Sequence, residues 1–182
     1  PGFKGIAGAP GLGVGYEEAI GFCPGPAHVR DKDGIATSVV AASLVAALKA
    51  QGRSVWDELE RLARLHGLHV SSPLTFRVEQ IEQIASGMAR LRAQPPSVLA
   101  GSPVVEVSDL SQGYRGLPPT DGVLVLTEAG DRVIARPSGT EPKLKCYLEV
   151  ILPVAEGEPL PWEQARERLD AIKGAFAEII GL

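Results

Sequence analysis

Residues 133–152 read VIARPSGTEPKLKCYLEVIL, and this stretch decides the fold. Both of its ends are rich in β-branched and other apolar residues, which is typical of strands. The middle, residues 136–142, holds proline, serine, glycine and threonine, the residue types that favour turns. The stretch therefore predicts two strands, over 133–135 and 144–152, joined by a loop. Within the second strand, one face alternates apolar side chains and is predicted to lie in the core: Leu144, Cys146, Leu148 and Val150.

Further strands and two helices are predicted around this pair. Strand-like runs cover residues 74–78, 104–107 and 123–126, and Ala129-Gly130-Asp131 forms a turn after the last of them. The chain between 81 and 91 repeats apolar residues at helical spacing and ends at Pro95-Pro96, and a final helix begins near Pro161. This order predicts an α+β fold, with an antiparallel sheet backed by helices on one face.

The first seventy residues differ in character. Residues 1–28 are rich in glycine and proline and predict loops around one short strand. From Asp33 to Gly52 a helix is apolar on most of its circumference, and we expect it to be buried. Ser54-Val55-Trp56-Asp57 has the spacing of a capping box for a second helix that stops at Gly67. Ser71-Ser72-Pro73 is the predicted boundary, so that the domains cover residues 1–72 and 73–182.

Composition excludes several classes of protein. The 182 residues are 45% hydrophobic, enough for a buried core, and the net charge of -4 with interspersed Lys and Arg does not form a basic nucleic-acid surface. No apolar run predicts a membrane span, and neither cysteine belongs to a metal motif, which indicates a reducing cytoplasmic location. The chain begins without Met or a signal region, and we expect it to be a fragment of a longer protein.

The loop over residues 136–142 has the chemistry of an anion site. Arg136 can bind two phosphate oxygens at once, and Ser138 and Thr140 offer hydroxyl donors. Gly139 would let the backbone bend so that its amides converge on the anion. The alternative is an ordinary hairpin turn, because the same residue types make turns.

Two earlier segments carry further polar candidates. In GYEEAIG, residues 15–21, the carboxylates of Glu17 and Glu18 could accept hydrogen bonds from sugar hydroxyls, or they could be solvated surface acids.

The other segment is HVRDKDG, residues 28–34. Its Asp33 is a predicted helix N-cap, while His28, Arg30 and Lys32 could serve a second phosphate or proton transfer. The segment lacks the further acids of a calcium loop, and no metal ligands are predicted.

Together, in this order, the three segments resemble the α-D-phosphohexomutase superfamily, which includes phosphoglucomutases and phosphomannomutases. RPSGTEP is similar to the phosphate-binding loop of the family's fourth domain, GYEEAIG to the sugar-recognition loop of its third domain, and HVRDKDG to the stretch after that loop. The resemblance implies a partial α/β third domain followed by a TATA-binding-protein-like fourth domain.

The resemblance also implies roles for single residues. Arg136, Ser138, Gly139 and Thr140 would hold the non-reacting phosphate, Glu17 and Glu18 would contact the sugar, and His28 and Arg30 would line the same cleft. Lys32 would act as a general acid or base. The family passes a phosphoryl group from an enzyme phosphoserine through a sugar 1,6-bisphosphate, with Mg²⁺, and so interconverts sugar 1-phosphates and 6-phosphates.

Two departures from the family pattern limit what this chain is expected to do. Ala19 replaces a usual serine, which leaves the preferred hexose or pentose phosphate open. The phosphoserine and D-x-D-x-D metal loops do not occur in the sequence, so the chain alone is expected to be inactive, with its nucleophile and Mg²⁺ ligands on missing N-terminal domains. The alternatives are a non-catalytic sugar-phosphate binding module and a structural domain whose loop is only a turn.

Overall fold

A computed structural model describes residues 3–17, 21–139 and 141–181 of the chain. These residues form two compact units that divide between Glu60 and Arg61.

The first unit contains two short strands and two complete helices. The strands β1 (Gly15–Glu17) and β2 (Gly21–Cys23) pair antiparallel, and the helices are α1 (Phe3–Ala7) and α2 (Gly34–Ala50). Its small core joins Phe3, Ala7 and Cys23. The prediction of loops around one strand was therefore wrong, because the glycine-rich segment closes into a helix and a hairpin.

Helix α2 begins where the sequence predicts, and its cap is clear. The Asp33 side chain accepts hydrogen bonds from the backbone N–H groups of Ile35, at 3.1 Å, and Ala36, at 2.9 Å. These bonds satisfy two of the donors that a helix leaves free at its first turn, so Asp33 is confirmed as the N-cap.

The expectation that α2 is buried was wrong for the part of the chain that the structure describes. Leu48 is its only residue in the buried class, whereas Ile35 is 84% exposed and Val39 is 64% exposed. The physical reason is the size of the unit: one five-residue helix and two three-residue strands cannot cover a helix of 17 residues. An apolar pattern shows that a helix surface is suited to burial, but burial also requires other elements that pack against that surface.

Helix α3 (Val55–His66) confirms the predicted capping box. The Asp57 carboxylate accepts from the Ser54 backbone N–H at 2.6 Å, and the Asp57 N–H donates to the Ser54 hydroxyl at 3.2 Å. The bond from the Ser54 amide is the main cause that lowers the pKa of the Asp57 carboxyl, since it stabilises the ionised form.

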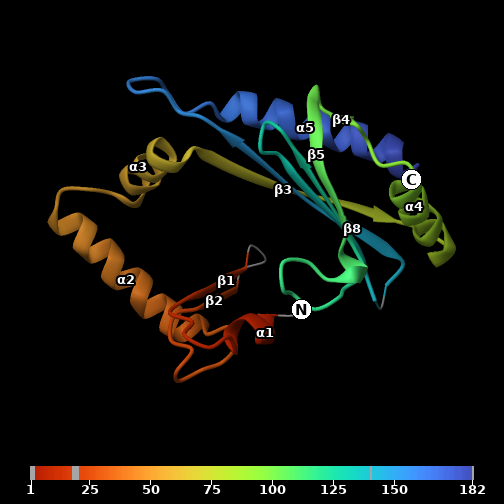
Figure 1. Ribbon diagram of the computed structural model, residues 1–182. Helices are drawn as coiled ribbons and strands as arrows, with labels where there is room; N and C mark the ends of the chain where they lie inside the picture. Colours follow the sequence, from red (N-terminus) through yellow and green to blue (C-terminus); the bar gives the residue numbers. More distant parts are fainter. Residues whose placement is uncertain (1–2, 18–20, 140, 182) are drawn as a thin grey trace. The chain divides into compact units, whose positions relative to one another are not determined.

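The second unit is an antiparallel sheet of six strands with helices α4 (Ile81–Ala93) and α5 (Trp162–Ile180) on one face (Figure 1). The strand order is β3-β8-β7-β6-β5-β4. The strands are β3 (Leu68–Arg77), β4 (Val98–Leu99), β5 (Ser102–Asp109), β6 (Val123–Thr127), β7 (Arg132–Pro137) and β8 (Lys143–Leu152), with a 3-10 turn η1 (Leu110–Gln112) after β5. The predicted α+β class, with an antiparallel sheet and helices on one face, is confirmed.

The alternation of β8 sets which face is the core. Its even-numbered residues from Leu144 to Leu152 are buried, and they pack with Ile172 and Phe176 of α5. Consecutive side chains in a strand point to opposite faces, so the odd-numbered residues of β8 lie on the face away from the helices. We call this second surface the open face.

The boundary expected at Ser71-Ser72-Pro73 lies within a strand. β3 runs through these three residues and pairs with β8 along its whole length, from Leu68 opposite Leu152 to Arg77 opposite Lys143. Pro73 lacks an N–H donor, and a proline is accommodated here because β3 is an edge strand with one partner. Serine and proline at this point therefore mark a sheet edge, and the compact units divide earlier in the chain.

No single helix in the described ranges is long and apolar enough to cross a membrane; only α2 and α3 together, bent by 89°, reach that length and composition.

Candidate functional site

The RPSGTEP loop joins β7 to β8 at one end of the sheet. Arg136 is exposed and lies directly opposite Lys145 on β8, and Arg77 of β3 lies directly opposite Lys143. The neighbours of these residues, Ala135 and Leu144 among them, face the core, so the four cationic residues belong to the open face. We call Arg77, Arg136, Lys143 and Lys145 the cationic end.

The cationic end carries an excess of positive charge. Like charges directly opposite one another in a sheet repel, and here two such pairs are adjacent. Among the described residues no ion pair involves Arg77, Arg136 or Lys145, whereas Lys143 pairs with Glu141 in the loop. Three guanidinium or ammonium groups are thus available to an oxyanion at this edge.

The pKa of the Glu141 carboxyl is lowered by the positive charges of the cationic end. The ion pair with Lys143 is the main cause that lowers the pKa of the Glu141 carboxyl, and the nearby charges of Arg77 and Lys145 lower it further.

One of the loop amides that the sequence predicts to converge on an anion is engaged within the hairpin. The Ser138 N–H donates to the Lys143 carbonyl at 2.9 Å and closes the hairpin, so this amide is not available to an anion. Gly139 has no left-handed φ, and a Cβ added there would meet nothing within 4 Å, so its surroundings do not demand a glycine. Thr140 lies outside the described residues. Among the described residues, the groups that this edge offers to an anion are mainly charged side chains.

The first unit brings Glu17 and Lys32 together. The Lys32 Nζ lies 2.7 Å from Oε1 of Glu17 and 5.3 Å from the centroid of the Phe3 ring, which gives a cation–π contact. The Asp33 N–H donates to the Phe22 carbonyl at 2.9 Å and ties the Lys32 segment to the hairpin.

Gly21 makes room for this pair. A Cβ at position 21 would lie 2.4 Å from Cγ of Glu17 and 2.8 Å from Cε of Lys32, distances that no real Cβ tolerates. Glu17 and Lys32 are separate candidates in the sequence, and no local pattern predicts their contact or the need for glycine at position 21.

The remaining candidates of the first unit lie apart from this pair. Within the described residues no hydrogen bond or ion pair joins His28 or Arg30 to Glu17 or Lys32. His28 is exposed in a turn, where its N–H donates to the Gly25 carbonyl at 2.9 Å. Arg30 lines a separate cavity of about 430 Å³ with α1 and the loop after it. Glu18 and Ala19 lie outside the described residues.

Arg77, Lys143 and Lys145 were not predicted from the sequence as site residues. A signal was present for two of them, because Lys-Leu-Lys directly after the loop places two charges on one face of a strand. Arg77 is distant in sequence and becomes part of the group only through the pairing of β3 with β8.

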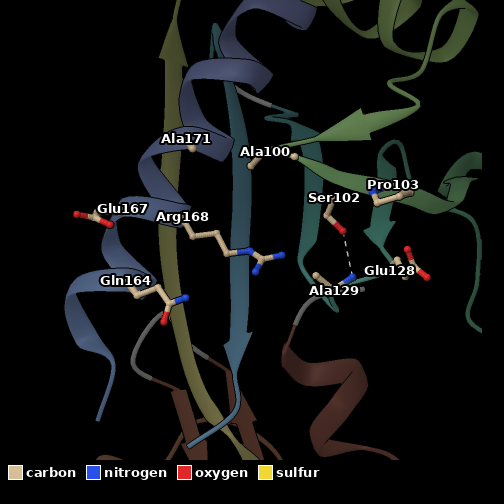
Figure 2. A pocket seen from close by; sticks show the side chains of 10 residues that line it. Ala100, Ser102, Pro103, Glu128, Ala129, Gln164, Glu167, Arg168 and Ala171 are labelled. Atoms are coloured by element: carbon tan, nitrogen blue, oxygen red, sulfur yellow. Dashed lines mark hydrogen bonds between the residues drawn. The ribbon is translucent and has the colours of Figure 1, made fainter. Parts of the chain in front are cut away.

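A second cavity, of about 540 Å³, lies beside the turn between β6 and β7, at the opposite end of the sheet (Figure 2). Arg168 reaches from α5 toward this turn, and its Nε and Nη2 donate to Oδ2 of the buried Asp131 at 3.0 and 2.8 Å. These bonds give Arg168 a structural role, since the partner carboxylate is fully buried.

In the part of the chain that the structure describes, no three His, Cys, Asp or Glu side chains gather in a way that could hold a metal ion. These described residues do not fit a magnesium site.

Known proteins resemble the chain in both sequence and fold. The family model "Phosphoglucomutase/phosphomannomutase, C-terminal domain" matches residues 76–160. A probable phosphomannomutase of Haemophilus influenzae is 40% identical over 148 residues, which cover 81% of this chain and 30% of that protein. A human phosphopentomutase is 28% identical over 181 residues, covering 90% of this chain and 29% of the relative.

Two further proteins agree with these matches. A Staphylococcus haemolyticus phosphoglucomutase is 34% identical over 149 residues, covering 74% of this chain and 27% of that protein. The open-form crystal structure of the phosphoglucomutase pp63/parafusin from Paramecium superposes with a TM-score of 0.61 at 18% identity, covering 93% of this chain and 31% of that one. The chain thus spans about 30% of the length of the relatives it matches.

Proposed function

Because this chain belongs to the phosphoglucomutase/phosphomannomutase family, we propose that it is the substrate-binding part of a phosphomutase that interconverts sugar 1-phosphates and 6-phosphates. Its cationic end would hold the phosphate that does not react. The whole reaction would run from an enzyme phosphoserine through a bisphosphate intermediate, and this chain supplies neither the nucleophile nor a metal loop.

The observation that carries the proposal is the unbalanced charge beside the RPSGTEP loop. Arg136 can offer two parallel N–H donors to a phosphate, while Lys145 and Arg77 add positive charge on the same face. A dianion at this edge would relieve the repulsion between the paired cations. The hydroxyls of Ser138 and Thr140 are proposed as further donors, and Gly139 as part of the same loop.

The Glu17–Lys32 pair supports a role in sugar binding and proton transfer. The Lys32 Nζ lies 2.7 Å from Oε1 of Glu17, and we propose that Lys32 acts as a proton donor or binds the reacting phosphate. The second oxygen of Glu17 would accept a hydrogen bond from a sugar hydroxyl. Glu18, His28 and Arg30 are proposed as additional sugar contacts.

For the longer protein we propose an isomerase of carbohydrate metabolism that is a phosphoprotein, binds Mg²⁺ and sugar 1,6-bisphosphate, and works in the cytoplasm. Its catalytic loops would lie on N-terminal domains, and the present chain alone would be inactive. The relatives are named for phosphomannose, phosphoglucose and phosphopentose chemistry, so the sugar stays open. A non-catalytic sugar-phosphate binding module is the alternative, because the groups proposed for the phosphate site are donors to an anion and include no nucleophile.

Arg136→Ala tests the phosphate site. Removing a bidentate guanidinium from an exposed site is expected to weaken binding of glucose 1-phosphate about tenfold, close to 1.4 kcal/mol. Arg166→Ala is the matched control, because it removes one exposed arginine of α5 that forms no ion pair among the described residues. Titration calorimetry at low salt measures both variants. A loss below about twofold, or equal losses in the two variants, would exclude the assignment of Arg136.

A further inference from the structure

Glu141 is the one carboxylate that forms an ion pair with the cationic end among the described residues. It lies in the loop two residues before Lys143 and pairs with the Nζ of that lysine. Arg77 lies opposite Lys143 across the β3–β8 pair, so the Glu141 carboxylate is surrounded by cations of two strands. An acid at this position competes for the groups that would hold a phosphate.

The two partners differ in how firmly they are held. The Lys143 side chain is 13% exposed, whereas the Glu141 side chain is 51% exposed. The lysine is therefore a fixed part of the sheet, and the glutamate reaches it from solvent. Because the lysine is mostly buried, leaving it unpaired would be costly, so the exposed glutamate can turn into solvent when another anion takes its place.

The backbone does not need to move for this exchange. The Lys143 N–H donates to the Glu141 carbonyl at 2.7 Å, and the Val78 N–H donates to the Pro142 carbonyl at 3.1 Å. With the Ser138–Lys143 bond of 2.9 Å, these bonds fix the end of the loop against β3 and β8. Release of Lys143 then needs only rotation of the Glu141 side chain.

A carboxylate and a phosphate are both acceptor-only oxyanions, and they bind the same ammonium and guanidinium donors. We propose that Glu141 is a built-in counter-ion: it occupies Lys143 while the site is empty and is displaced when the phosphate of the substrate binds. This inference rests on the proposed phosphate site and assigns Lys143 to it. Glu141 would thereby lower the affinity of the site and favour ligands with two negative charges over weaker anions.

The test compares Glu141→Gln with the unchanged chain, using inorganic phosphate as the probe. Removing the competing charge is expected to lower the dissociation constant by roughly two- to tenfold at low salt, the effect of one surface charge. The difference is expected to shrink as the salt concentration rises. Glu128→Gln is the charge-matched control, because Glu128 is exposed in the β6–β7 turn at the far end of the sheet. The affinity of this variant for phosphate is expected to equal that of the unchanged chain. Circular dichroism confirms that each variant is folded.

The possible outcomes separate the counter-ion role from the site itself. If the unchanged chain binds phosphate and Glu141→Gln binds it equally well or more weakly, the counter-ion role alone is overturned. Weaker binding by Glu141→Gln would show that Glu141 positions Lys143. No binding by either protein would overturn the phosphate site, and the inference with it. As a second measurement, the carboxyl carbon resonance of Glu141 should move on phosphate addition toward its position in Lys143→Met. A resonance that does not move would contradict displacement.

Discussion

Arg168→Met removes the partner of the one fully buried acid of the second unit among the described residues. Asp131 is 0% exposed, and its Oδ2 accepts from Nε and Nη2 of Arg168 and from the Thr127 hydroxyl at 3.1 Å. Its Oδ1 is buried without a partner. The substitution keeps the apolar stem of the side chain and deletes two charge-assisted hydrogen bonds, which leaves a buried carboxylate with one hydroxyl donor.

The cost follows from this geometry. Breaking a buried ion pair by removing one partner costs about 3 to 5 kcal/mol. Because the Arg168 side chain is 24% exposed, solvent screens its side of the pair, and the lower end, about 3 kcal/mol of unfolding free energy, is expected. For a chain of this size that loss corresponds to a Tm lower by about 6 to 12 °C.

Urea denaturation of Arg168→Met, Asp131→Asn and the double variant measures this coupling. The double variant should recover a large part of the loss, because a neutral amide is cheaper to bury than an unpaired charge. A loss below about 1 kcal/mol in Arg168→Met, or additive losses in the double variant, would refute the idea that Arg168 serves to neutralise Asp131.

Four further outcomes are expected. Gly21→Ala should separate Glu17 from Lys32, because the added Cβ would collide with both side chains. Gly34→Ala is the control and should keep the ion pair, because a Cβ there meets nothing within 4 Å. NMR of the Lys32 ammonium distinguishes the two variants, and an intact pair in Gly21→Ala would contradict the steric role of Gly21. Ser54→Ala should cost about 1 kcal/mol by chemical denaturation through loss of the α3 cap. Since the pKa of Asp57 is lowered in the folded chain, its contribution to stability is present above its unfolded pKa of about 4 and is lost as pH falls through the folded value. A stability difference between Asp57→Asn and the parent that does not shrink as the pH falls below about 4 would contradict this. Burial raises the pKa of the Cys146 thiol to about 12, so this thiol should resist a thiol reagent at pH 8 until the chain is unfolded. The labelling is measured in Cys23→Ser, where Cys146 is the remaining cysteine, and rapid labelling of the folded protein would be inconsistent with burial of Cys146.

The second unit followed the sequence closely because its signals are local and redundant. In β8 the alternation of apolar residues over ten positions predicts both the strand and which of its faces is buried. The helix around Met88 and the helix around Phe176 show apolar residues at helical spacing, and both pack on the predicted face of the sheet. β4 was missed because a two-residue strand is too short to show any period.

The first unit resisted prediction because its pattern depends on partners. α2 carries the apolar residues of a buried helix and is nevertheless mostly exposed in the described residues. The sequence of a helix does not show whether other elements pack against its apolar surface, so this exposure could not be predicted. The hairpin of β1 and β2 rests on three paired positions within a glycine-rich segment, and such a segment reads as loop.

The sequence by itself determined the α+β class, the order of the long elements, the caps at Asp33 and Ser54, and the position of the RPSGTEP loop between two strands. Each of these depends on residues close together in the chain, where spacing and side-chain chemistry suffice. Only the tertiary structure decided that Arg77 joins Arg136, Lys143 and Lys145, that Glu141 pairs with Lys143, and that Gly21 lets Glu17 reach Lys32. These contacts depend on strand register and on the space around each backbone atom, which are set when distant segments pack and which no local pattern encodes.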